Sequence, residues 1–194
     1  MTLSLLKLTH HMWSLFLKPG DFVIDATCGN GHDSLVLASK VLLEGHGTLL
    51  CMDIQQQALA ATKKRLEENF APYQFKNIIY HLGCHSQFPL FKEAPKWIVY
   101  NLGYLPGSDK TVKTTFSSTL KSVKKGLQLL QLGGGLTLTL YSGHEEGKAE
   151  KEALLNFSKS LNKSDFLVFH QEILNRAHAP STLTILKNSL PVVP

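Results

Sequence analysis

The chain has 194 residues, of which 43% are hydrophobic and 18% are charged, and its formal net charge is +5. This length and apolar content predict a single folded domain over residues 1–194 and exclude an intrinsically disordered chain. The basic balance permits an anionic partner such as RNA without requiring one. The longest uncharged run of interest, residues 126–144, contains three consecutive glycines, so we expect no membrane span. Three scattered cysteines and the lack of an export signal favour a cytoplasmic protein.

Apolar residues at helical spacing alternate along the chain with short apolar runs that are typical of buried strands. Leu5, Leu8, Met12 and Leu15 mark the first helix. Further helices are predicted over residues 35–42, 55–69, 112–130 and 149–161. Strands are predicted over residues 21–25, 47–53, 76–82, 97–101, 136–141, 166–170 and 181–186.

This alternation predicts an α/β fold with a doubly wound, mostly parallel sheet. The two closing strands follow one another without a helix between them, which predicts an antiparallel pair at one edge of the sheet. In such a fold, ligands bind at the carboxyl ends of the parallel strands. We therefore expect the functional residues of this chain at the carboxyl ends of its parallel strands.

The first two strand ends carry the residues of a candidate cofactor site. The first strand ends in Asp25 and leads into a turn with Gly29 and Gly31, where the backbone can approach a ligand closely. The second strand ends in Asp53, whose carboxylate can accept both hydroxyls of a ribose. Together they predict a cofactor that contains adenosine. The alternative is that the glycines only make a tight connection and that Asp53 caps the helix at Gln55.

The same segment distinguishes between two cofactors. A nicotinamide site of the G-x-G-x-x-G type would have glycine where this chain has Ser34. The Asp25 carboxylate would repel a pyrophosphate, whereas it suits the α-ammonium group of S-adenosylmethionine. The pattern therefore favours S-adenosylmethionine over a dinucleotide.

The fourth strand ends in Asn101, in a loop that faces the reactive end of such a cofactor. The Asn101 side-chain oxygen and a nearby backbone carbonyl can accept hydrogen bonds from an amine and direct its lone pair toward a methyl group. Tyr104 can stack on a flat base. The alternative is a plain loop, with Asn101 in an Asx-turn and Tyr104 as a half-buried aromatic residue.

Several basic residues surround this edge. His144 could contact a phosphate or assist proton removal, and Lys148 could meet a phosphate. Lys110 and Lys113 are well placed for RNA phosphates, whereas the basic stretch 121–125 is more typical of a solvated helix face. His81 and His85 have the spacing of metal ligands on a helix, but they fall on and after a predicted strand, so we expect no metal site.

Three segments carry a resemblance to a known family: DATCGNGHDS at 25–34, NLGYLPGSDK at 101–110 and YSGHEEGKAE at 141–150. They resemble blocks of a small bacterial methyltransferase family, the rRNA methylases, which includes the tRNA 5-aminomethyl-2-thiouridine methyltransferases. The resemblance runs over nearly the whole chain. It implies a Rossmann-like class I S-adenosylmethionine-dependent methyltransferase fold, with seven strands of which the last is antiparallel.

The resemblance also implies a reaction and two groups of site residues. The reaction is N-methylation of the 5-aminomethyl group of 5-aminomethyl-2-thiouridine at the wobble position of tRNA, so the partner is the anticodon region of tRNA. The cofactor-binding residues would be Asp25, Thr27, Gly29, Asn30, Gly31, His32, Asp33, Asp53, Gln55, Cys84, His85, Ser86 and Asn101. The substrate-binding residues would be Gly103, Tyr104, Leu105, Pro106, Lys110, Tyr141, Gly143 and His144. Asn101, Tyr104 and His144 are the expected catalytic residues.

Two alternatives stay open at this point. The first is the same fold and cofactor acting on rRNA or on a small molecule. The second is a non-catalytic module that binds adenosine and RNA. The sequence also leaves open whether the protein is a homodimer.

Overall fold

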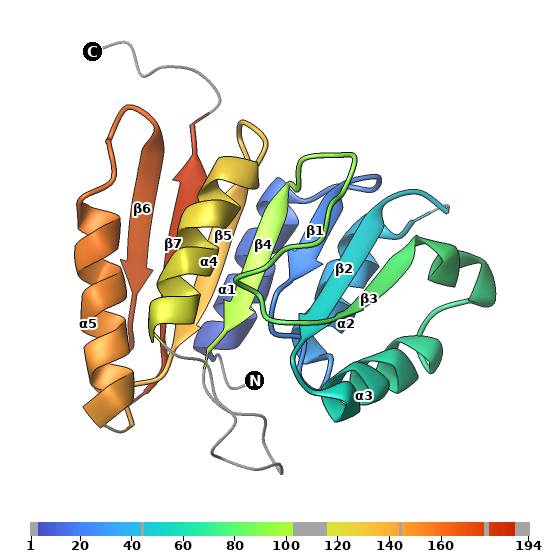
Figure 1. Cartoon of the computed structure of the whole chain (residues 1–194), viewed down its shortest axis with the longest axis horizontal. Coiled ribbons are helices and arrows are strands. Elements are labelled where there is room, and N and C mark those ends of the chain that lie inside the picture. Colours follow the sequence, from blue (N-terminus) through green and yellow to red (C-terminus); the bar gives the residue numbers. More distant parts are fainter. Residues whose placement is uncertain (1–3, 44, 103–115, 144, 177–178, 189–194) are drawn as a thin grey trace.

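The computed structural model describes residues 4–43, 45–102, 116–143, 145–176 and 179–188. Seven strands form one sheet in the order β3-β2-β1-β4-β5-β7-β6 (Figure 1). The strands are β1 (Phe22–Asp25), β2 (Thr48–Asp53), β3 (Ile78–Leu82), β4 (Trp97–Asn101), β5 (Gly135–Leu140), β6 (Phe166–Gln171) and β7 (Ser181–Lys187). β7 is antiparallel to both of its neighbours, β5 and β6, and the other pairs are parallel. The predicted fold class is confirmed, and so is the antiparallel pair at one edge.

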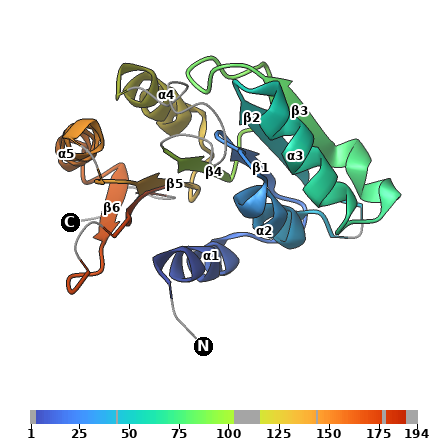
Figure 2. The same ribbon diagram turned by 90° about the horizontal axis from the view of Figure 1, so that it is seen from below.

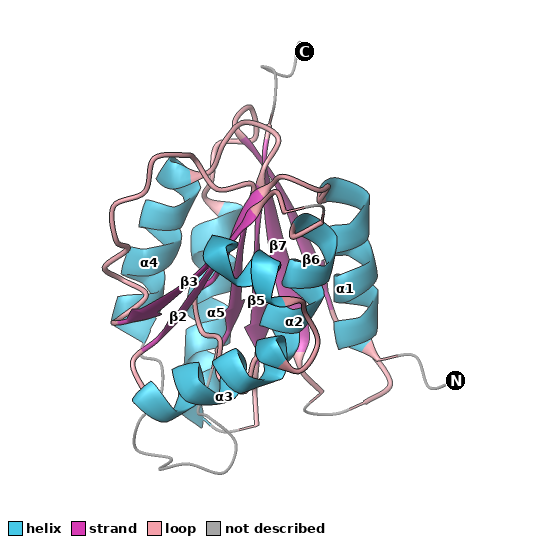
Figure 3. Ribbon diagram, turned by 90° about the vertical axis from the view of Figure 1, so that its right-hand side faces the viewer, coloured by secondary structure: helices cyan, strands magenta, loops and turns pink. Residues whose placement is uncertain are grey.

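Helices cover both faces of the sheet (Figures 2 and 3). They are α1 (Leu5–Phe16), α2 (His32–Val41), α3 (Gln56–Glu67), η1 (Pro72–Asn77), α4 (Phe116–Leu129) and α5 (Glu145–Lys159). α1, α2 and α3 pack against one another in sequence order on one face, and α4 packs beside α5 on the other. Each face has its own apolar core, because buried strand residues alternate between the two sides.

Predicted and observed elements differ by a few residues at most of their ends, and two of these differences concern β3 and α4. β3 begins at Ile78, because Lys76 and Asn77 belong to η1, a 3₁₀ turn that has Pro72 near its start. The helix predicted over 112–130 is described from Phe116, so Val112 lies outside the described residues. None of the described helices has the length and apolar composition that crossing a bilayer requires.

α1 buries part of the face that its apolar residues indicate: Leu5 is buried and Met12 packs against the core, as predicted, but the helix is rotated away from Leu8 and Leu15. Leu8 and Leu15 are exposed, whereas Thr9 and Trp13 are buried. The Trp13 indole N–H donates to Thr137 Oγ1 on β5 at 3.3 Å, and the Trp97 indole N–H of β4 donates to the same oxygen at 3.0 Å. One hydroxyl oxygen thus satisfies two buried donors and fixes the rotation of α1 against the sheet.

We expect Thr137→Val to destabilise the fold. The variant keeps the shape of the side chain but leaves two buried indole N–H groups without an acceptor, at about 1–3 kcal/mol for each group. Chemical denaturation followed by tryptophan fluorescence measures the loss. Thr137→Ser keeps the oxygen and should lose less stability than the valine variant. A valine variant as stable as the wild type would show that the two indoles find other acceptors.

Candidate functional site

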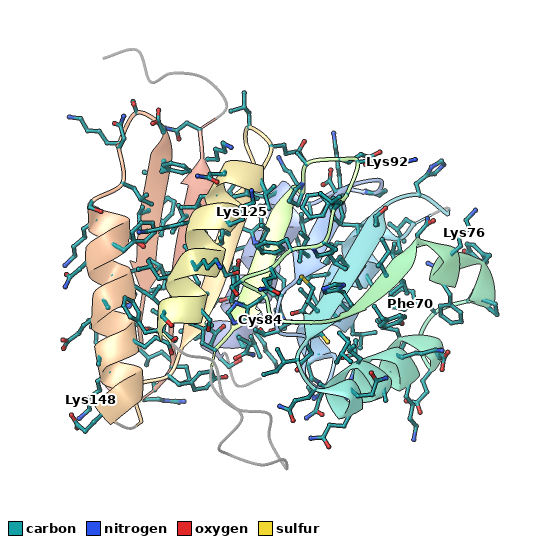
Figure 4. All side chains as sticks on the ribbon, in the orientation of Figure 1. Phe70, Lys76, Cys84, Lys92, Lys125 and Lys148 are labelled. Atoms are coloured by element: carbon teal, nitrogen blue, oxygen red, sulfur yellow. The ribbon has the colours of Figure 1, made fainter. Side chains whose placement is uncertain are left out.

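The carboxyl ends of β1, β2 and β4 meet at one edge of the sheet. β1 lies between the other two, with Asp25 in register with Cys51 of β2 and with Val99 of β4. Asp25, Asp53 and Asn101 therefore lie close together, as the sequence predicts for neighbouring parallel strands. This edge is the lower one in Figure 1, and in Figure 4 Cys84 is labelled beside it.

Side chains of α3 hold the turn after β1 through hydrogen bonds to its backbone carbonyls. Gly31 is the N-cap of α2 and has a φ of 76°, a conformation that glycine adopts without strain. The Thr62 hydroxyl donates to the Gly29 carbonyl at 3.0 Å, and Arg65 Nε donates to the Asn30 carbonyl at 2.6 Å. Arg65 also lies 3.4 Å from His32 Nε2. Thr62 and Arg65 could not be identified from the sequence, because they reach the turn only through the packing of α3.

Asp53 lies two residues before the N-cap of α3 and supports the turn after β1. Its Oδ1 accepts the Gln55 N–H at 3.0 Å, and its Oδ2 accepts the Gly29 N–H at 3.0 Å. Asp53 thus binds the backbone N–H of the N-cap residue, whereas α3 itself has no side-chain cap hydrogen bond. The Asp53 side chain is half-buried, and each carboxylate oxygen retains a further lone pair that can accept from a ligand hydroxyl.

Asp25 is a buried carboxyl group with neutral partners. It accepts the Ser34 hydroxyl at 2.6 Å and the Thr27 N–H at 3.3 Å, and it is 1% exposed. Burial, followed by the nearby charge of Asp33, raises the pKa of Asp25 to about 7. A ligand cation beside it would favour the ionised form. The α-ammonium group of S-adenosylmethionine is such a cation, so the chemistry of the residues present fits this cofactor.

Asp33, in the first turn of α2, joins two further elements to the site. Its Oδ1 lies 2.7 Å from Nε2 of His10, on α1. Its Oδ2 accepts a hydrogen bond from Nδ2 of Asn101, on β4, at 3.3 Å. His10 could not be identified from the sequence, since nothing near it in the chain indicates that α1 packs beside α2.

Asn101 is fixed through both its backbone and its side chain. Its backbone N–H donates to the Thr27 hydroxyl at 2.7 Å, which connects the end of β4 to the turn after β1. Tyr141, which follows β5, lies near the Asn101 side chain. Partial burial and the Asp33 charge raise the pKa of Tyr141, and its interaction with the Asn101 side chain opposes this effect. Gly143, nearby in the sequence, is exposed.

The three predicted cofactor residues that follow β3 differ in how deeply they are buried. The Cys84 sulfur and the Ser86 hydroxyl are 3.1 Å apart, and both side chains are half-buried. The His85 ring is buried and packs edge-on against Tyr100, with ring centroids 5.8 Å apart. Burial lowers the pKa of His85 to about 4, so the ring is neutral at neutral pH.

Seven of the predicted site residues lie outside the described part of the chain. They are Gly103, Tyr104, Leu105, Pro106, Lys110, Lys113 and His144. Within the part that is described, no three His, Cys, Asp or Glu side chains come together as metal ligands.

Several known proteins are similar to this chain in both sequence and fold. The family model described as "Putative rRNA methylase" matches residues 49–187. The chain belongs to this family. It is also 32% identical over 187 residues to a curated Arabidopsis thaliana protein named tRNA (mnm(5)s(2)U34)-methyltransferase, chloroplastic; the match covers 93% of this chain and 68% of that protein.

Two solved structures of bacterial proteins are similar over almost their whole length. A putative rRNA methylase from Clostridium thermocellum is 33% identical, with a TM-score of 0.88, over 96% of this chain and 100% of that one. A putative methyltransferase from Streptococcus mutans, solved in complex with SAH, is 32% identical, with a TM-score of 0.82, over 96% and 99% of the two chains. The chain is therefore a class I methyltransferase of the rRNA and tRNA methylase type, and its cofactor is S-adenosylmethionine.

The contribution of Asp25 to the stability of the ligand-free protein should fall as the pH rises from about 4 to about 7. The unfolded Asp25 loses its proton near pH 3.8, whereas the folded Asp25 keeps it to about pH 7, so the folded state binds the extra proton in this window. Neutral His85 acts in the opposite direction, so the difference between variant and wild type is the quantity to measure. In Asp25→Asn the contribution of Asp25 disappears, which thermal denaturation at several pH values would show. Asp165→Asn, at an exposed site, is the control, and parallel curves for wild type and Asp25→Asn would contradict the raised pKa.

Gly31→Ala should disrupt the turn, because a Cβ at Gly31 would lie 2.8 Å from the Thr62 Cα on α3. We expect at least about a tenfold loss of cofactor affinity, because the left-handed backbone of alanine adds strain of about 1–2 kcal/mol to this collision. Isothermal titration with S-adenosylhomocysteine measures the loss. Gly45→Ala is a matched control, since Gly45 has the same φ of +76° with no heavy atom within 4 Å of its Cβ position. Equal cofactor affinity in the two variants would show that the contact with α3 is unimportant.

Proposed function

We propose that the protein methylates the primary amine of 5-aminomethyl-2-thiouridine at the wobble position of tRNA, giving 5-methylaminomethyl-2-thiouridine. The observation that carries the proposal is the orientation of Asn101. Its amino group donates to Asp33, so its Oδ1 is left to accept an N–H from a substrate amine. The name of the Arabidopsis relative, a tRNA (mnm(5)s(2)U34)-methyltransferase, supports the same acceptor.

The cofactor would lie across the ends of β1, β2 and β3. Asp25 would hold its α-ammonium group, and Asp53 with Gln55 would hold the ribose. Gly29 and Gly31 would let the backbone come close to it, and the first turn of α2 would present its free backbone N–H groups. The remaining predicted contacts, which line the same edge, are Thr27, Asn30, His32, Asp33, Cys84, His85, Ser86 and Asn101. Since the His85 ring faces Tyr100, we expect His85 to border the adenine through its backbone.

The residues of the chain contribute positioning to the transfer. Bound S-adenosylmethionine supplies an electrophilic methyl group on its sulfonium. The amine must be neutral to attack, and Asn101 with the Leu102 carbonyl would direct its lone pair along the line of displacement. The proton would leave to solvent or through His144. Tyr104 would cover the base, and Tyr141 with Gly143 would form the far wall.

The RNA would reach this edge from the side of α4 and α5. Lys148 lies near the start of α5, close to the carboxyl ends of the strands, whereas Lys125 lies toward the other end of α4 (Figure 4). The Lys124 ammonium lies 5.5 Å from the Phe157 ring centre, which fits a packed surface helix. We therefore expect Lys148 and Lys110 to contribute more to tRNA affinity than the basic stretch of α4. The reaction would take place in the cytoplasm, in one methyltransferase domain over residues 1–194.

Nucleoside mass spectrometry tests the proposal. The protein is incubated with S-adenosylmethionine and with tRNA that carries 5-aminomethyl-2-thiouridine, and we expect a gain of one methyl group on that nucleoside. rRNA is the second candidate, because the family model is described by that substrate. A methyl gain in purified rRNA, with none in the tRNA, would show that the substrate is rRNA and not the wobble uridine of tRNA.

Asn101→Ala should lower kcat by about 100-fold on whichever RNA the wild type methylates, because the substrate amine loses its orientation. Its affinity for S-adenosylhomocysteine should stay within about threefold of the wild type, since Asp25 and Asp53 are unchanged. Asn156→Ala, at an exposed position of α5, is the matched control. Unchanged turnover in Asn101→Ala would favour an acceptor held elsewhere.

A further inference from the structure

A buried carboxylate connects the first helix of the chain to the candidate acceptor site. Asp33 is 6% exposed, and its two oxygens face His10 on α1 and Asn101 on β4. The distance to His10 Nε2 is 2.7 Å, and the distance to Asn101 Nδ2 is 3.3 Å. Three elements that are distant in the sequence thus meet at one side chain.

The chemistry of the carboxylate determines how both partners are oriented. An ionised carboxylate only accepts hydrogen bonds, so each partner must present an N–H to it. Asn101 therefore turns its amino group toward Asp33, and its Oδ1 points elsewhere. For the same reason His10 must carry a proton on Nε2.

His10 is itself held in place by the core. Its ring packs against the Trp13 ring, with centroids 4.8 Å apart and an interplanar angle of 41°. Trp13 is 1% exposed and is bound through its indole N–H to Thr137 of β5. The position of His10 therefore follows from the packing of α1 on the sheet, and it reaches Asn101 through Asp33.

We propose that His10 is a positioning residue of the acceptor site, which acts through Asp33 to hold the Asn101 carboxamide with its Oδ1 toward the substrate amine. The inference rests on the proposed function for the identity of the acceptor. A purely structural tie between α1 and α2 would need the contact of His10 with Asp33 alone. The second oxygen of Asp33 instead binds the one side chain that the proposed function places against the amine.

Kinetics of three variants test this role. His10→Leu removes the N–H donor, and His10→Gln retains one near the end of a side chain of similar length. His11→Leu is the matched control, since His11 is the next residue of α1 and is exposed. We expect His10→Leu to lower kcat by about 10- to 100-fold because Asn101 loses its orientation. KM for the tRNA and the affinity for S-adenosylhomocysteine should stay within about threefold of the wild type, and His10→Gln should regain most of the rate.

Two kinetic outcomes would overturn the inference. One is a kcat in His10→Leu equal to that of the His11→Leu control. The other is a loss of kcat that accompanies an equal loss of cofactor affinity and that His10→Gln does not restore, which is the result for a helix that has lost its packing.

A measurement without substrate separates this inference from the proposed function. The side-chain amide of Asn101 gives a pair of ¹H–¹⁵N resonances, which are assigned by their absence in Asn101→Ala. In the complex with S-adenosylhomocysteine we expect these resonances to shift in His10→Leu and to lie near the wild-type position in His10→Gln. Unchanged resonances in His10→Leu would overturn the inference. If the wild type methylates no amine of the tRNA, the proposed function fails, and these resonances still decide whether His10 orients Asn101.

Discussion

The parallel pairing of β1 with both β2 and β4 is the constraint on which the site depends. The three strands lie side by side and run the same way, so Asp25, Asp53 and Asn101 end at one edge. The antiparallel strand β7 lies beyond β5 and takes no part in this arrangement. The site is therefore built at the carboxyl ends of the parallel strands β1 to β5, whereas the β6–β7 pair extends the sheet and its core.

The same edge of the sheet brings three carboxyl groups close together, those of Asp25, Asp33 and Asp53. Each of them has different hydrogen-bond partners. Asp53 accepts two backbone N–H groups, and Asp33 faces His10 and Asn101. Asp25 has only the Ser34 hydroxyl and the Thr27 N–H, and its pKa is raised to about 7. Asp25 is thus the carboxyl group for which a ligand cation changes the energy of ionisation most. This difference favours the amino-acid end of the cofactor at Asp25 and the ribose at Asp53.

The sequence predicted the sheet and the strand-end residues because their signals are local. Buried runs such as 47–53 and the turn at Gly31 can be recognised without knowledge of the rest of the chain. His10 and Arg65 could not be predicted, because each acts on a segment more than 20 residues away through helix packing. The orientation of α1 could not be predicted either. Its leucines recur around much of the helix, and the contact of Trp13 with Thr137 decides which side is buried.

Asp33 belongs to both halves of the site. It lies in the first turn of α2, which would hold the cofactor, and its second oxygen orients Asn101, which would hold the acceptor. A change at Asp33 therefore alters both halves at once and cannot separate binding from transfer. His10 contacts Asp33 from α1, outside the turn itself, so a change there leaves the turn and its support by α3 in place. The contribution of α1 to the acceptor half is for this reason best isolated at His10, one step removed from the groups that would touch either ligand.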